Sequence, residues 1–87
     1  MEIRIEHHTL KRAMERGTNE AEIREVIKTG FPVSAKYGKE GKGKIFSYKQ
    51  IRLNKYYEHK RVEVFYIVEE NIIITVTVYV FYGKWEV

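Results

Sequence analysis

Apolar residues recur every three or four positions through the first third of the chain, which is the spacing of a buried helical stripe. Leu10, Ala13 and Met14 predict a helix over residues 8–16, which Gly17 ends. The stripe of Ile23, Val26 and Ile27 predicts a second helix. Asn19 is suited to cap it, Glu22 three residues later completes a capping box, and Gly30 followed by Pro32 ends it.

The hydrophobic period changes to two after Pro32, as expected for strands. Ile3 and Ile5 alternate with charged neighbours and predict a short N-terminal strand. The glycine-rich run 38–43 predicts a flexible turn, residues 52–60 a polar connection, and residues 69–71 a tight turn. The strands expected between these breaks cover residues 33–37, 44–51, 61–68 and 72–82.

Helices followed by strands predict one α+β domain over residues 1–87, with two N-terminal helices on one face of an antiparallel sheet of about four strands. Alternation along the last strand is expected to place Ile72, Ile74, Val76, Val78 and Val80 under the helices. The opposite positions are Ile73, Thr75, Thr77, Tyr79 and Phe81. That mixed polar and aromatic face suits either a binding surface or a half-exposed sheet.

Composition narrows the protein class. The 87 residues include no cysteine, which excludes disulfides, thiolate zinc sites and cysteine nucleophiles, and the Lys- and Glu-rich, Asp-free composition is typical of thermophiles. The longest apolar run, residues 72–82, is far shorter than the ~20 residues of a membrane-spanning helix. No signal peptide is visible, so a cytoplasmic location is expected, with no membrane partner.

The positive charge is concentrated in residues 36–61, which contain nine Lys and Arg residues and only two acidic residues, Glu40 and Glu58. This segment predicts either a side that binds polyanions or a solvated lysine-rich loop. No metal or cofactor site is expected, because His7 and His8 are adjacent and diverge by about 100° on a helix, and His59 is remote in sequence.

The first helix carries the strongest chemical signal. His8, Arg12 and Arg16 stand at i, i+4 and i+8, so an imidazole and two guanidiniums share one stripe. Imidazole suits proton transfer near neutral pH, and guanidinium suits phosphate binding. The structural alternative is that the arginines pair with Glu15 or Glu20 and that His8 only begins the helix.

The run H-x-x-x-R-x-x-x-R-G from His8 to Gly17, the helix ending at Gly30 and the final strand through residues 73–76 resemble a small domain family of unknown function. That family is grouped with the barnase, EndoU, colicin and RelE-like superfamily of ribonuclease toxins. The resemblance covers about residues 8–82. Its matching positions are His8, Arg12, Arg16, Gly17 and Thr75.

The resemblance implies a metal-independent endoribonuclease that is the toxin of a toxin–antitoxin pair. In such an enzyme the 2′-hydroxyl of the RNA attacks the adjacent phosphorus and cleaves the strand. RNA, on or off the ribosome, and an antitoxin protein are then the expected partners. His8 is expected to act in acid–base catalysis and Arg12 to stabilise the phosphate, with Thr75 and Tyr79 lining the site. The expected RNA contacts are Lys44, Arg61 and Arg16, the last of which could instead support the site.

Two alternatives to the enzyme remain open. One is a non-catalytic RNA- or partner-binding module on the same fold, in which the basic segment holds phosphates and aromatic residues stack on bases. The other is an interaction protein whose sheet edge pairs with a partner strand.

Overall fold

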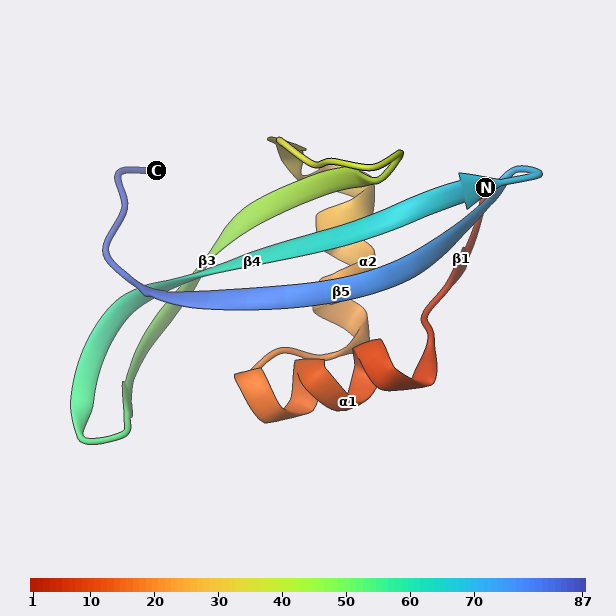
Figure 1. Ribbon diagram of the computed structural model, residues 1–87. Coiled ribbons are helices and arrows are strands. Elements are labelled where there is room, and N and C mark those ends of the chain that lie inside the picture. Colours follow the sequence, from red (N-terminus) through yellow and green to blue (C-terminus); the bar gives the residue numbers. More distant parts are fainter.

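Five strands form one mixed sheet in the order β1-β5-β4-β3-β2, and two helices pack beside it (Figure 1). The computed structural model describes residues 1–87. Its elements are β1 (Glu2–Arg4), α1 (His7–Arg16), α2 (Glu20–Thr29), β2 (Phe31–Val33), β3 (Glu40–Arg52), β4 (Lys55–Glu69) and β5 (Ile72–Gly83). The expected α+β class is therefore confirmed. The sheet has a fifth strand and is not wholly antiparallel, because β1 pairs in parallel with β5.

Both helices begin and end close to the predicted residues. The Asn19 side chain caps α2 by accepting a hydrogen bond of 2.9 Å from the backbone N–H of Glu22. In α1 the buried residues are Thr9 and Ala13, whereas Met14 is 72% exposed. The buried side of α1 is thus narrower and more polar than the predicted stripe of Leu10, Ala13 and Met14. The reason is that α1 lies along the margin of the sheet and not over its centre.

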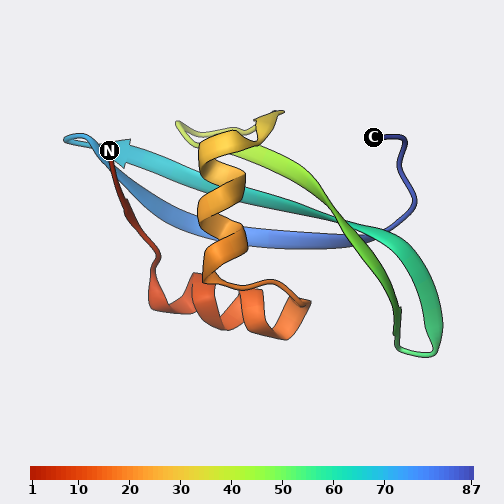
Figure 2. The same cartoon turned by 180° about the vertical axis from the view of Figure 1, so that it is seen from behind.

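The core lies between α2 and one face of β4 and β5. Figure 2 shows α2 crossing in front of the sheet and α1 running along the β5 margin. Ile23 and Val26 of α2 are fully buried against Val62, Val64 and Val78. Each fully buried aliphatic side chain of this size contributes about 1.5–3 kcal/mol to folding.

The strands differ from the sequence-based expectation in the middle of the chain. β2 covers Phe31–Val33, earlier than expected, and Pro32 is tolerated because β2 is an edge strand. The glycine-rich segment is a turn only at its start, where Tyr37 and Gly38 have a positive φ. Gly41 and Gly43 lie within β3, where a Cβ on Gly43 would come within 2.9 Å of the Phe31 ring. These glycines leave room for aromatic rings to cross the sheet surface.

Residues 52–60 are not a polar connection either. Leu53 and Asn54 form a two-residue turn with φ of 51° and 67°, and residues 55–60 continue as β4. Positive φ at both positions is the signature of a type I′ hairpin turn. The paired ends of β3 and β4, residues 48–58, form a long twisted arm that extends past α1 (Figure 1).

A β-bulge in β5 changes which residues face the helices. Tyr66 pairs with Thr75 and Phe65 with Thr77, so Val76 is an extra residue and the alternation reverses there. Ile73 and Thr75 face the helices before the bulge, whereas Val78 and Val80 do so after it. The expected continuous row from Ile72 to Val80 is therefore wrong for its first half.

Candidate functional site

Helix α1 covers an edge of β5 that has no neighbouring strand. β1 pairs with β5 only over residues 72–74, and beyond them the outer backbone groups of β5 lack a strand partner. The His8 Nε2 atom lies 2.9 Å from the Val76 carbonyl oxygen, and Arg16 Nη1 donates to the Val78 carbonyl oxygen at 2.6 Å. The two ends of the motif stripe therefore hold α1 on the strand edge and block further strand pairing there.

The bond to Val76 fixes the tautomer of His8. A carbonyl oxygen can only accept, so Nε2 must carry the proton, and in the neutral ring Nδ1 keeps its lone pair. Nδ1 has no hydrogen-bond partner in the protein, and His8 is exposed. The structure thus holds an oriented imidazole whose remaining nitrogen is free to accept a proton from a ligand.

Arg12 stands between His8 and Arg16 in the sequence but does not bind the sheet. Its Nη1 atom lies 3.2 Å from Glu15 Oε1, and the two side chains are 57% and 49% exposed. An ion pair this exposed contributes little to stability, about 0.3–0.5 kcal/mol. Arg12 is therefore the motif cation that can exchange its partner for a bound phosphate at small cost.

Thr75 lies beneath the surface. It is 1% exposed, and its hydroxyl accepts a hydrogen bond of 3.0 Å from the backbone N–H of Glu6, just before α1. It therefore positions the start of α1, next to His8 on Val76, and offers no surface to a ligand. The His8 stripe lies beside the Thr75 region of β5, as the sequence-based hypothesis requires. Thr75 itself is buried and supports the start of α1 and does not line the site.

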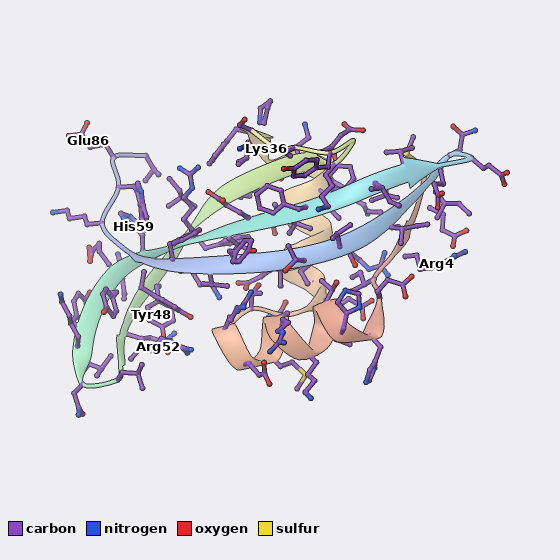
Figure 3. The ribbon with its side chains drawn as sticks, viewed as in Figure 1. Arg4, Lys36, Tyr48, Arg52, His59 and Glu86 are labelled. Carbon is purple, nitrogen blue, oxygen red and sulfur yellow. The ribbon has the colours of Figure 1, made fainter.

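Gly17 is required by its surroundings. Its φ of 98° is left-handed, and a Cβ there would collide with the Tyr82 hydroxyl. Tyr82 donates to the Arg16 carbonyl oxygen at 2.6 Å, and Arg52 reaches from the arm to the Glu15 carbonyl oxygen at 3.2 Å (Figure 3). The end of α1 is thus held by both β5 and the arm.

Lys60 joins the helix junction to β4. It is 8% exposed, and its ammonium donates to the Gly17 carbonyl oxygen at 2.9 Å and to Glu22 at 2.8 Å. Thr18 donates to the same carboxylate oxygen at 2.7 Å. This cation belongs to the structure of the domain and is not available to a polyanion.

The other expected RNA contacts have acidic partners. Lys44 lies on the helix-covered side, where its ammonium is 2.7 Å from Glu25 and 2.8 Å from the Thr29 hydroxyl. Arg61 lies on the opposite side, 2.7 Å from Glu63 and with its guanidinium carbon 4.9 Å from the centre of the Phe31 ring. The structure does not bring either of them together with His8 and Arg12.

The face of the sheet away from the helices, here called the open face, holds Arg61 and Tyr79, which were selected from the sequence, together with residues that were not. Arg61, Glu63 and Phe65 of β4 pair with Phe81, Tyr79 and Thr77 of β5, and paired residues share a face. Next to them His59 Nδ1 accepts a hydrogen bond of 3.1 Å from the Trp85 backbone N–H. The period-two pattern placed Thr77, Tyr79 and Phe81 on this face correctly, whereas Ile73 and Thr75 were expected there but face the helices because of the bulge at Val76.

Three tyrosine hydroxyls have a raised pKa, and Tyr82 is the one that contacts the site. Burial is the largest cause of the raised pKa of Tyr82, with Arg52 acting in the opposite direction and Tyr48 and Glu22 adding to the rise. Burial and the charge of Glu40 raise the pKa of Tyr66. Tyr56 is exposed, and partial desolvation together with its hydrogen bond to Glu58 raises its pKa. Tyr82 is therefore a neutral hydrogen-bond donor at physiological pH.

Comparison with protein-family models, with curated proteins and with solved structures finds no significant match to this chain. The structure contains no group of three or more His, Cys, Asp or Glu side chains arranged to hold a metal ion. None of its helices has the length and apolar character needed to cross a membrane.

Proposed function

We propose that this protein is a metal-independent endoribonuclease that uses His8 for proton transfer and Arg12 for phosphate binding. The observation that carries the proposal is the His8 ring: its Nε2 is fixed by the Val76 carbonyl oxygen, while Nδ1 is unpaired. A hydrogen bond that fixes one ring nitrogen and leaves the other free is the usual arrangement of a histidine base.

The reaction needs few groups from the protein because RNA supplies its own nucleophile. His8 Nδ1 takes the proton of a ribose 2′-hydroxyl, and the oxygen forms a bond to the adjacent phosphorus. The bond from phosphorus to the 5′-oxygen then breaks, and that oxygen takes a proton from solvent water, while protonated His8 returns its proton to the solvent. Arg12 stabilises the added negative charge on the phosphoryl oxygens, and the products carry a 2′,3′-cyclic phosphate and a 5′-hydroxyl.

The resemblance of residues 8–17 to the ribonuclease toxin group supports a more specific proposal. In this interpretation the fold is RelE-like, the chain is the toxin of a toxin–antitoxin pair, and an antitoxin protein masks it. Such a toxin stops growth when produced alone and is neutralised when its antitoxin is produced with it.

The enzyme is tested with purified protein and single-stranded RNA in EDTA. His8→Ala is expected to slow cleavage by about 10²–10⁴-fold, the usual contribution of a general acid–base group. His7→Ala is the matched control, because His7 is the adjacent exposed histidine and has no hydrogen-bond partner. Circular dichroism verifies that both variants fold. Equal cleavage by wild type and His8→Ala contradicts the assignment of His8.

A second candidate is a non-catalytic RNA-binding module on the same fold. It is favoured by the bonds that the motif makes within the protein: Arg16 is held by Val78, and the Gly17 carbonyl oxygen by Lys60. These bonds explain much of the motif without catalysis. Binding of RNA that leaves every strand intact in both wild type and His8→Ala identifies this candidate.

A further inference from the structure

The open face exposes a row of aromatic rings. Tyr79 and Phe81 are 43% and 46% exposed, and their ring centres lie 6.4 Å apart at an interplanar angle of 31°. Phe65 stands edge-on to Tyr79 at 5.9 Å. Neither helix covers these rings, because both pack on the opposite side and at the β5 margin (Figure 1). Exposed neighbouring rings of this kind are typical of stacking surfaces.

A hollow of about 360 Å³ lies next to this row, between β4, β5 and the connection from β2 to β3. Its charged residues are Lys36 and Lys39, and no acidic residue lines it. Figure 3 shows Lys36 on that connection, at the margin of the open face. The lining residues are Ser34, Ala35, Lys36, Tyr37, Lys39, Phe65, Thr77 and Tyr79. An apolar, aromatic hollow with only positive charge suits a flat ring that carries an anion.

Tyr37 extends this surface. It is 90% exposed, has a left-handed φ of 59°, and holds its ring 6.0 Å from the Lys39 ammonium. Tyr37 and Gly38 both have a left-handed φ and form a two-residue turn, which a hydrogen bond of 3.2 Å from the Lys39 backbone N–H to the Lys36 carbonyl oxygen closes. This turn accounts for the backbone conformation of Tyr37 and holds its exposed ring beside the hollow.

Arg16 connects the open face to His8. Its Nη1 atom binds the Val78 carbonyl oxygen at the β5 edge, and its guanidinium carbon lies 5.1 Å from the centre of the Tyr79 ring. His8 binds Val76, two residues earlier on the same edge. An extended ligand that lies across the β5 edge can therefore contact both the rings of the open face and the side of α1 that carries His8 and Arg12.

We infer that the open face binds a single-stranded RNA segment, with bases stacked on Tyr79 and Phe81 and backbone phosphates near Lys36 and Lys39. Charge complementarity selects a polyanion, and the exposed rings select unpaired bases, because the bases of a duplex are stacked on one another. This inference deepens the proposed function, since it rests on RNA as the substrate, but binding does not require that cleavage occurs.

The test measures binding of a fluorescent single-stranded RNA whose 2′-hydroxyls are all methylated, so that it cannot be cleaved. Tyr79→Ala is expected to weaken binding by about tenfold or more, as loss of a stacked base partner does. Tyr79→Phe keeps the ring and is expected to bind as wild type does. Tyr56→Ala is the matched control, because Tyr56 is 55% exposed but lies on the arm.

Phe81→Ala provides a second reading if Tyr79→Ala does not fold, with the same expected direction. Replacing Lys36 and Lys39 by Ala is expected to flatten the dependence of log affinity on log salt by about 1.4, since each single-strand phosphate contact contributes about 0.7. His7→Ala, which changes an exposed histidine outside the catalytic assignment, should bind the methylated strand as tightly as wild type. Binding of RNA without cleavage of normal RNA would refute the proposed endoribonuclease activity and would support the RNA-binding surface.

Three results would overturn the inference. The first is unchanged affinity in Tyr79→Ala and Phe81→Ala. The second is tighter binding of an RNA duplex than of the single strand. The third is a stable dimer in sedimentation that Tyr79→Ala dissociates, because a second copy would then cover the open face.

Discussion

At the scale of single residues, Tyr82 shows how one hydroxyl helps to hold the candidate site. It donates to the last carbonyl group of α1 at Arg16, beside Gly17. Arg52 lies over its ring, with the guanidinium carbon 4.8 Å from the ring centre. The Tyr82 hydroxyl, Gly17 and Arg52 of the arm therefore all contribute to holding the C-terminal end of α1.

Tyr82→Phe is expected to lower the free energy of unfolding by about 1 kcal/mol at neutral pH, because a half-buried carbonyl loses its donor. Burial raises the pKa of Tyr82 above its ordinary value of 10.0, so the fold favours the neutral phenol. That contribution is complete below pH 10 and is lost as pH rises through the folded-state pKa. The free energies of unfolding of wild type and Tyr82→Phe, measured in urea, should thus converge above pH 10. A gap that widens with alkali would contradict the assignment.

Leu53 is a residue whose type does not suit its conformation. It is 91% exposed and takes a φ of 51° in the type I′ turn of the arm, where Asn and Gly are preferred. This is also why the sequence did not reveal the turn: of Leu53 and Asn54, only Asn54 is a residue that favours a positive φ.

Leu53→Asn is expected to raise the free energy of unfolding by about 1 kcal/mol, because it relieves left-handed strain and removes no packing. The melting temperature should rise by about 4–8 °C. Leu53→Val should lower it, since a β-branched residue is still less suited to a positive φ. Equal melting temperatures for the two variants would show that the strain is absent.

At the scale of elements, the ion pair of Lys60 with Glu22 ties the α1–α2 junction to β4. The side chains are 10% and 22% exposed, so loss of either partner leaves a largely desolvated charge. The exposed pair of Arg12 with Glu15 is the natural contrast, because solvent screens it.

Lys60→Met is therefore expected to cost about 2–3 kcal/mol, with Arg12→Met costing about 0.5 kcal/mol or less. The double variant Lys60→Met with Glu22→Gln should be more stable than the sum of its single changes predicts, since the unpaired carboxylate is gone. Denaturant unfolding measures wild type, the three single variants and the double variant. Additive effects of the two changes would argue against the pair.

The elements with local signals were those that the sequence could predict. Both helices carry their own stripes and glycine ends, and the β4–β5 hairpin has a two-residue turn between strong strands. The remaining features depend on contacts distant in sequence. They are the parallel pairing of β1, the extent of the arm and the bulge at Val76.

At the scale of the whole molecule, pairing divides the basic segment. Of the nine cations in residues 36–61, Lys44, Lys60 and Arg61 have acidic partners within the fold. The five lysines without an acidic partner are Lys36 and Lys39 at the hollow, Lys42 within β3, and Lys49 and Lys55 on the arm. The charge that attracts a polyanion is thus smaller than the sequence total indicates, and two of these five lysines lie beside the open face.

The candidate site was predictable in its helix and not in its surroundings. The spacing of His8, Arg12 and Arg16 places them on one stripe, but only the structure shows that His8 and Arg16 bind the β5 edge while Arg12 remains exposed. Tyr79 and Phe81 were expected on the face away from the helices and lie there, because the bulge at Val76 changes only the residues before it. The sequence did not reveal that Lys36, Lys39 and Phe65, from distant segments, border the same surface.

The most direct test of the central claim follows the ends of RNA cut in EDTA. Wild type and His7→Ala are incubated with a single-stranded RNA, and mass spectrometry identifies the products. The account predicts fragments with 2′,3′-cyclic phosphate and 5′-hydroxyl ends, none from a strand whose 2′-hydroxyls are methylated, and almost none with His8→Ala. Intact RNA with folded wild-type protein, or cleavage of the methylated strand, would contradict it.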